Sequence, residues 1–360
     1  MYVWSRAALF LIAVSTVLLF ADRINPERGR WDSGRLHELG VAVDVWARWD
    51  SDWFVRIAQD GYAWPSSTPA FFPLYPLLTG VVGRALLGHE LLAGVLVSLV
   101  AAAVAFVLLH RLGERVVGRE AALRAVVLLA VFPTSLFLGA VYSEALFLAL
   151  ALTAFLLAER GRIGWAAVVT GLAMLARAQG AALLPALAIF AWRRRGPRGL
   201  ATLSVPLALF ACYPVLLGAW IGRPLAFLDA QAAVWEREPS SLGPLGGLAA
   251  AARDASLVDR DLVALAFAAA MVPLAVLAWR RLGAAYGAYA LAALAIPMSF
   301  PSDRLGGLVS FPRLCLVAFP CFLAAGTIRA SRPVSVGVTA VLAALLVVNV
   351  VRWSLWYWVA

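Results

Sequence analysis

Long apolar runs recur along this chain, and their length restricts the fold more than any other feature. Most are about 17–20 residues long, enough for an α-helix to cross the hydrocarbon core of a bilayer. Hydrophobic residues make up 63% of the 360 and charged residues only 14%, which excludes a water-soluble domain. We therefore expect an all-α polytopic membrane protein. Its spans, about eleven in number, are expected at 4–20, 91–109, 122–138, 142–158, 163–176, 181–192, 200–221, 262–279, 284–299, 314–328 and 334–351.

The basic residues indicate how the spans are oriented. The net charge is +10, and the chain contains arginine but no lysine. The arginines cluster in short loops between apolar runs, which is typical of cytoplasmic loops next to anionic lipid and does not suggest a nucleic-acid surface. We expect a cytoplasmic N-terminus and an extracytoplasmic C-terminus. Because arginine-only usage fits a GC-rich bacterial genome, the expected location is the plasma (inner) membrane of a bacterium.

This orientation places the polar chemistry on one side of a single integral membrane domain, residues 1–360. Three large loops, 21–90, 222–261 and 300–313, should be extracytoplasmic. The first of them should carry amphipathic or interfacial helices. Turns near 133–144 and 177–180 should lie on the same side, so ionisable side chains far apart in sequence can meet there.

The stretch 45–76 carries most of the polar chemistry of the N-terminal half. Its periodicity predicts an amphipathic helix at 46–59, with aromatic residues on one face. Asp52 has a ready partner in Arg56, four residues further on. Asp50 instead falls among the aromatic residues with no partner at that spacing. A carboxylate in such a position suggests a functional task.

Four further ionisable residues approach apolar helix on the extracytoplasmic side: Glu144, Arg177, Arg304 and Arg313. A charge at membrane depth costs about 2.5–3.5 kcal/mol or more, so such residues usually serve a site. Structural alternatives remain open for three of them. Glu144 could cap a helix start, Arg177 could extend toward the lipid headgroups, and Arg304 could be an ordinary loop arginine.

Several segments together resemble a known family. Trp49-Asp50, IAQDGY and AFFPLYP, followed by PTSLFLGAVYSEALF, ARAQG, GRPLAFLDAQAAVWER and SFPRLCLVAFP, occur in the order found in the PIG-V-type mannosyltransferases. These membrane enzymes are related to the second mannosyltransferase of GPI-anchor assembly. The first three form one N-terminal signature, so five matching pieces occur in register; no single piece is diagnostic, but the five together are specific. Gln179 departs from the pattern, where serine or asparagine is expected.

The resemblance implies a GT-C glycosyltransferase fold with a large first extracytoplasmic loop. It also implies an inverting mannosyltransferase that moves mannose from a polyprenyl-phosphate-mannose donor to a hydroxyl of a lipid, glycan or protein. Asp50 is the expected catalytic base. Arg313, Arg177 and Arg304 are the expected ligands of the donor phosphate. Contacts to sugar or acceptor are expected from Asp52, Glu144, Gln179, Gln231 and Trp235.

No required metal or other cofactor is expected. The histidines His37, His89 and His110 are scattered, and the three cysteines lie in apolar runs without metal-ligand spacing. A donor with one phosphate also needs a divalent ion less than a diphosphate donor does. Two alternatives remain: a GT-C transferase with another sugar or acceptor, and a polytopic lipid or solute transporter. A transporter would more often show inverted repeats, and none is evident.

Overall fold

The computed structural model describes residues 1–254, 260–302 and 304–359, and these are almost entirely helical. Residues 255–259 of the second polar loop and Asp303 of the third lie outside the described residues. The α-helices are α1 (Tyr2–Leu19), α2 (Val41–Asp44), α3 (Ser51–Asp60), α4 (Leu74–Ala85), α5 (Glu90–Val117), α6 (Arg119–Val131), α7 (Glu144–Glu159), α8 (Ile163–Ala176), α9 (Leu183–Arg195), α10 (Ser204–Ile221), α11 (Ala226–Trp235), α12 (Pro244–Asp254), α13 (Arg260–Leu282), α14 (Ala284–Met298), α15 (Phe311–Leu314), α16 (Phe319–Gly326) and α17 (Arg332–Ser354).

Helices occur at every position where the apolar runs predict a span, and α8 has the same boundaries as the predicted span 163–176. Two predicted spans are not single helices. In the predicted span 122–138, α6 ends at Val131 and a separate 3₁₀ turn covers Ser135–Leu138. The other is the predicted span 314–328. It is divided into α15, a 3₁₀ turn over Cys315–Val317, and α16, which has Pro320 in its first turn. Because proline disfavours helical backbone in the residue before it, the helix restarts there. Arg313 therefore lies in a short separate helical turn at the end of the third polar loop.

Five helical stretches in the described part of the chain are long and apolar enough to cross a membrane. They are α1, α5, α13, α17 and the stretch Ala178–Ile221, which includes α9 and α10. Large apolar side chains on α1, α10 and α17 point outward, among them Trp4, Val215 and Val341. Outward apolar surface of this extent is favourable against lipid rather than against water.

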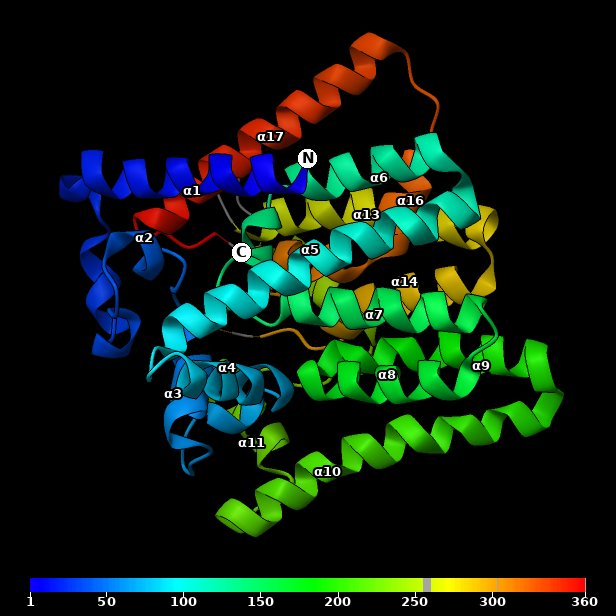
Figure 1. Cartoon of the computed structure of the whole chain (residues 1–360), viewed down its shortest axis with the longest axis horizontal. Coiled ribbons are helices and arrows are strands. Elements are labelled where there is room, and N and C mark those ends of the chain that lie inside the picture. The colour runs from blue at the N-terminus through cyan, green and yellow to red at the C-terminus, as the bar shows by residue number, and fades with distance from the viewer. Residues whose placement is uncertain (255–259, 303, 360) are drawn as a thin grey trace.

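The long helices run roughly parallel, and α2, α3, α4 and α11 gather at one end of the bundle, on the left in Figure 1. α5 packs against α4, α6 and α7, and α3 packs against α4. The short helices of the first and second polar loops therefore form a cap on that end.

The turn before α3 differs from the sequence-based expectation. The amphipathic helix predicted at 46–59 begins only at Ser51, and the backbone at Trp49 is left-handed, with φ +55°. Tertiary contacts offset the strain of this conformation, about 1–2 kcal/mol. The Trp49 ring packs against those of Trp31, Trp356 and Trp358.

Two long-range hydrogen bonds also hold the chain before this turn. Trp353 Nε1 donates to the Val45 carbonyl at 2.7 Å, and the Val141 backbone N–H donates to the Trp46 carbonyl at 3.0 Å. The C-terminal helix and the segment before α7 thus fix a turn that local periodicity would have made helical.

Trp353→Phe tests the C-terminal contact. The substitution keeps an aromatic ring but leaves the buried Val45 carbonyl without its donor, which should lower the free energy of unfolding by about 1–3 kcal/mol. We expect a lower melting temperature in detergent. Trp165→Phe on α8, where the side chain is exposed, is the matched control and should melt like the wild type. Equal melting temperatures for all three proteins would contradict the role given to Trp353.

Candidate active site

Asp50 is the last residue of the turn and directly precedes α3. Its backbone N–H donates to the Tyr142 hydroxyl at 3.1 Å, and that hydroxyl donates to the Arg48 carbonyl at 3.1 Å. Its carboxylate accepts a hydrogen bond from Arg313 Nη1, with an N–O distance of 2.8 Å, although the two residues are 263 positions apart. Asp50 therefore pairs with an arginine from a distant part of the chain and not with a residue of α3.

Arg313 joins two carboxylates. Besides its bond to Asp50, its Nε lies 3.3 Å from Glu144 Oε1. The guanidinium stacks over the rings of Tyr142 and Phe137, 5.1 and 5.5 Å from the ring centres. Burial alone would lower the pKa of Arg313, but the charges of Asp50 and Glu144 raise it above its usual value. Arg313 is therefore a permanent cation.

Glu144 is the first residue of α7, and its side chain is only 1% exposed. The same Oε1 that approaches Arg313 lies 2.9 Å from Arg177 Nη1. Arg177 is itself mostly buried, so its charge is paired inside the protein and does not extend to the headgroups. The position of Glu144 at the start of α7 adds a favourable interaction with the helix dipole, but the two arginines are the main partners of Glu144.

Asp50, Arg313, Glu144 and Arg177 therefore form one continuous network, called here the charge quartet. Its formal charges cancel. The four residues lie at helix ends: the starts of α3 and α7, the end of α8, and α15. Asp50 is the most accessible carboxylate of the quartet, with 20% of its side chain exposed against 1% for Glu144. Asp50 is therefore the carboxylate of the quartet that is exposed to solvent.

The other sequence-predicted residues take different places. Gln179 is buried, and its Nε2 donates to the Ala293 carbonyl at 3.1 Å, which joins it to α14. Asp52 accepts hydrogen bonds from Ser33 and Arg56, and the predicted ion pair with Arg56 is present at 3.1 Å. Neither side chain is joined to the quartet by a described ion pair or side-chain hydrogen bond.

The remaining predicted residues lie in the second and third polar loops. The Trp235 ring meets the Phe71 ring edge-on, with centres 5.6 Å apart, and Gln231 is half-buried on α11. Arg304 is 57% exposed and lies 3.8 Å from Glu236. Arg304 is therefore a surface arginine, and the described contacts do not link it to the quartet.

Sequence reasoning missed two residues beside the quartet. Tyr142 touches both Asp50 and Arg313, and it stands two positions before Glu144 in the YSE segment. Arg237 interacts electrostatically with Arg313, Asp50 and Arg177, and it ends the segment AVWER. Both lie within segments quoted in the sequence analysis. A tyrosine or an arginine in such a segment does not by itself predict a place near Asp50.

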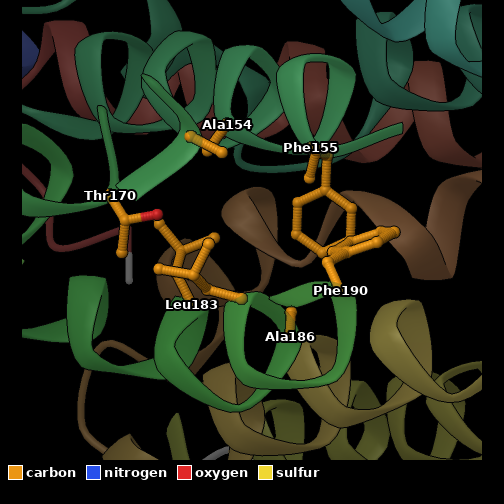
Figure 2. Close-up of a pocket in the computed structure, with 9 residues that line it drawn as sticks. Ala154, Phe155, Thr170, Leu183, Ala186 and Phe190 are labelled. Atoms are coloured by element: carbon orange, nitrogen blue, oxygen red, sulfur yellow. The ribbon is translucent and has the colours of Figure 1, made fainter. Parts of the chain in front are cut away.

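Two further features bear on what else the protein could bind. Within the described residues, no three His, Cys, Asp or Glu side chains are placed to hold a metal ion. A cavity of about 10 Å³ lies between α7, α8 and α9, and the rings of Phe155 and Phe190 meet edge-on at one side of it (Figure 2). Thr170 is its only polar side chain, and its volume suits a single water-sized molecule. It is a packing gap without groups for chemistry.

Glu144→Gln tests whether the quartet is coupled. It leaves a buried arginine charge uncompensated, so the free energy of unfolding should fall by about 3–5 kcal/mol. Arg177→Gln should destabilise in the same way, while the double variant should lose less than the sum of the single losses. Thermal unfolding of the four proteins in detergent measures this. Additive losses would show that the two side chains do not interact.

Residues 37–191 match the family described as Mannosyltransferase (PIG-V), a segment that includes Asp50, Glu144 and Arg177. The chain is similar to mouse GPI alpha-1,6-mannosyltransferase 2, with 38% identity over 136 residues, or 33% of this chain and 26% of the mouse protein. The rat protein of the same name is 37% identical over 161 residues, or 41% of this chain and 31% of that protein. The match thus covers less than a third of either relative.

The fold is similar over nearly the whole chain to that of ArnT from Cupriavidus metallidurans, crystallised with undecaprenyl phosphate. The TM-score is 0.56 at 17% identity, and the alignment covers 94% of this chain and 62% of ArnT. Together with the apolar helices, this similarity identifies an integral membrane protein. The chain is thus related through residues 37–191 to the mannosyltransferase (PIG-V) family, and it has the GT-C fold.

Proposed function

We propose that this protein is an inverting membrane glycosyltransferase that moves mannose from polyprenyl-phosphate-mannose to a hydroxyl of a lipid, glycan or protein. One observation carries the proposal: an accessible carboxylate, Asp50, is held by a buried arginine at the end of the bundle where the polar loops meet. The match of residues 37–191 to the PIG-V family supports mannose as the sugar.

Asp50 acts as the general base in this proposal. Its carboxylate takes the proton of the acceptor hydroxyl while the hydroxyl oxygen attacks the anomeric carbon of the sugar. The new bond forms on the face opposite the departing phosphate, which inverts the configuration. The bond between the anomeric carbon and the phosphate oxygen breaks, and the polyprenyl phosphate leaves with the electron pair. Arg313 orients the Asp50 carboxylate before the proton arrives.

The arginines compensate the charge that develops on the leaving phosphate. Once Asp50 is protonated, its bond with Arg313 weakens, and the freed guanidinium can turn toward the phosphate. Arg177 contributes through Glu144, which holds both cations in place. We assign to Trp235, whose ring packs against Phe71, the role of stacking on a sugar face.

The membrane arrangement suits a lipid-linked donor. The polyprenyl chain stays in the bilayer while its phosphate meets the loop end of the bundle, which we assign to the extracytoplasmic side, with the N-terminus in the cytoplasm. In a bacterium this is the outer face of the plasma membrane. ArnT, whose fold this chain shares, was crystallised with undecaprenyl phosphate, which supports a polyprenyl-phosphate donor.

Asp50→Asn should abolish transfer because an amide cannot accept the hydroxyl proton. We expect the rate to fall by about 10²–10⁴-fold, measured as mannose incorporation in membranes supplied with polyprenyl-phosphate-mannose. Asp60→Asn, at the far end of the same helix, is the matched control and should keep wild-type activity. Undiminished transfer by Asp50→Asn at normal expression would remove Asp50 from the mechanism. Transport of the donor without a glycosidic bond would indicate a transporter instead.

Transfer should also not depend on a divalent ion, because arginine side chains supply the positive charge for a donor with a single phosphate. Purified protein treated with EDTA is expected to keep its rate within about twofold, a change below 0.5 kcal/mol in the barrier. Loss of activity with EDTA and its return with Mg²⁺ or Mn²⁺ would contradict this expectation.

A further inference from the structure

The segment after α11 is fixed to the third polar loop by several hydrogen bonds. The Ser302 hydroxyl donates to the Trp235 carbonyl at 2.6 Å, and the Ser240 backbone N–H donates to the Ser299 carbonyl at 2.9 Å. An isolated antiparallel bridge joins Arg237 to Ser302. Residues 235–240 are therefore held against the loop that leads to Arg313.

Arg237 points from this segment toward the start of α15. Its Nη2 donates to the Val309 carbonyl at 3.2 Å, four residues before Arg313. Its Nε is buried and has no hydrogen-bond partner among the described residues. Within that part of the chain no carboxylate forms an ion pair with it, since the adjacent Glu236 approaches Arg304 instead.

Arg237 is also close enough to the quartet to interact with its charges. Removal from water and the positive charge of Arg313 lower the pKa of Arg237 to about 10, and the negative charge of Asp50 opposes this shift. Arg237 therefore remains a cation at neutral pH. Aromatic contacts also connect the segment that carries Arg237 to α3, which follows Asp50. The Trp235 ring contacts Phe71, and Phe71 contacts Phe54 of α3.

The quartet and Arg237 together carry a net charge of +1. The quartet cancels within itself, and its arginines already face carboxylates. Arg237 adds a single cation with unused donors in a poorly hydrated position, where an unpaired charge is unfavourable. A phosphodiester carries one negative charge, and its oxygens match the planar fork of a guanidinium.

We propose that Arg237 is the residue that binds the phosphate of the lipid-linked donor, and that this single unpaired cation favours a donor with one phosphate over one with a diphosphate. The proposal rests on the proposed glycosyltransferase function. The main phosphate contact is then Arg237 of the second polar loop. Arg313 already pairs with carboxylates, and Arg304 is exposed. A diphosphate-linked sugar would leave a net negative charge in the site.

Binding measured without acceptor tests the proposal, because no turnover then occurs. The full-length protein in detergent is titrated with three probes: polyprenyl-phosphate-mannose, polyprenyl phosphate without sugar, and polyprenyl-diphosphate-mannose. Arg237→Gln should weaken binding of the first two by about 10- to 100-fold, the effect of losing a charged hydrogen bond. Arg237→Lys keeps the charge and should recover part of the loss. Arg223→Gln, an exposed arginine of the same loop, is the matched control and should bind like the wild type.

The outcomes separate this inference from the proposed function. Wild-type affinity of Arg237→Gln for polyprenyl phosphate, or no binding of that probe by the wild-type protein, overturns the inference. Equal wild-type affinity for the phosphate-linked and diphosphate-linked sugars overturns the selectivity. If Arg237→Gln does not fold, Arg237→Lys decides: a weaker but measurable affinity supports the contact, and unchanged affinity overturns it. If Arg237→Gln loses affinity for polyprenyl phosphate while the wild-type protein transfers no mannose, the phosphate site is supported and only the proposed function is contradicted.

Discussion

The contact between Arg313 and two carboxylates is the interaction on which the rest of this site depends. Asp50 belongs to the first polar loop and Glu144 to the start of α7, and both pair with Arg313, which is distant from them in the sequence. The planar guanidinium can bond both at once, and the Tyr142 and Phe137 rings form an apolar floor beneath it. Arg313 lies in the short helix α15, which a 3₁₀ turn separates from α16.

Charge compensation explains how such a polar centre is tolerated in a mostly apolar bundle. Every member of the quartet faces an opposite charge, so the cost of removing it from water is offset locally. Arg237 lies outside the quartet, and no carboxylate among the described residues forms an ion pair with it. The quartet and Arg237 together carry one net positive charge, which suits an anionic ligand. Residues of all three polar loops would then take part in binding it.

The support of the site extends beyond the segment that matches the PIG-V family. The turn that presents Asp50 is held by Trp353 and packs against Trp356 and Trp358 at the C-terminal end of the chain. Arg313 and Arg237 also lie outside residues 37–191. The matched segment supplies the carboxylates and Arg177, while the rest of the chain supplies Arg313, Arg237 and the tryptophans that pack against Trp49.

The sequence by itself determined the helices, the meeting of the polar loops at one end, and the unusual charges at Asp50, Glu144, Arg177 and Arg313. These follow from local composition, because apolar length predicts a span and a charge beside apolar helix is unfavourable without a purpose. Only the tertiary structure decided that Arg313 pairs with Asp50, that the helix predicted at 46–59 begins at Ser51, and that Tyr142 contacts Asp50. It also decided that Arg237 bonds to the Val309 carbonyl in the loop before α15. Periodicity reports which residues share a face of one helix, but it holds no information on which distant segments meet. Those pairings are set by packing and by the pairing of buried charges.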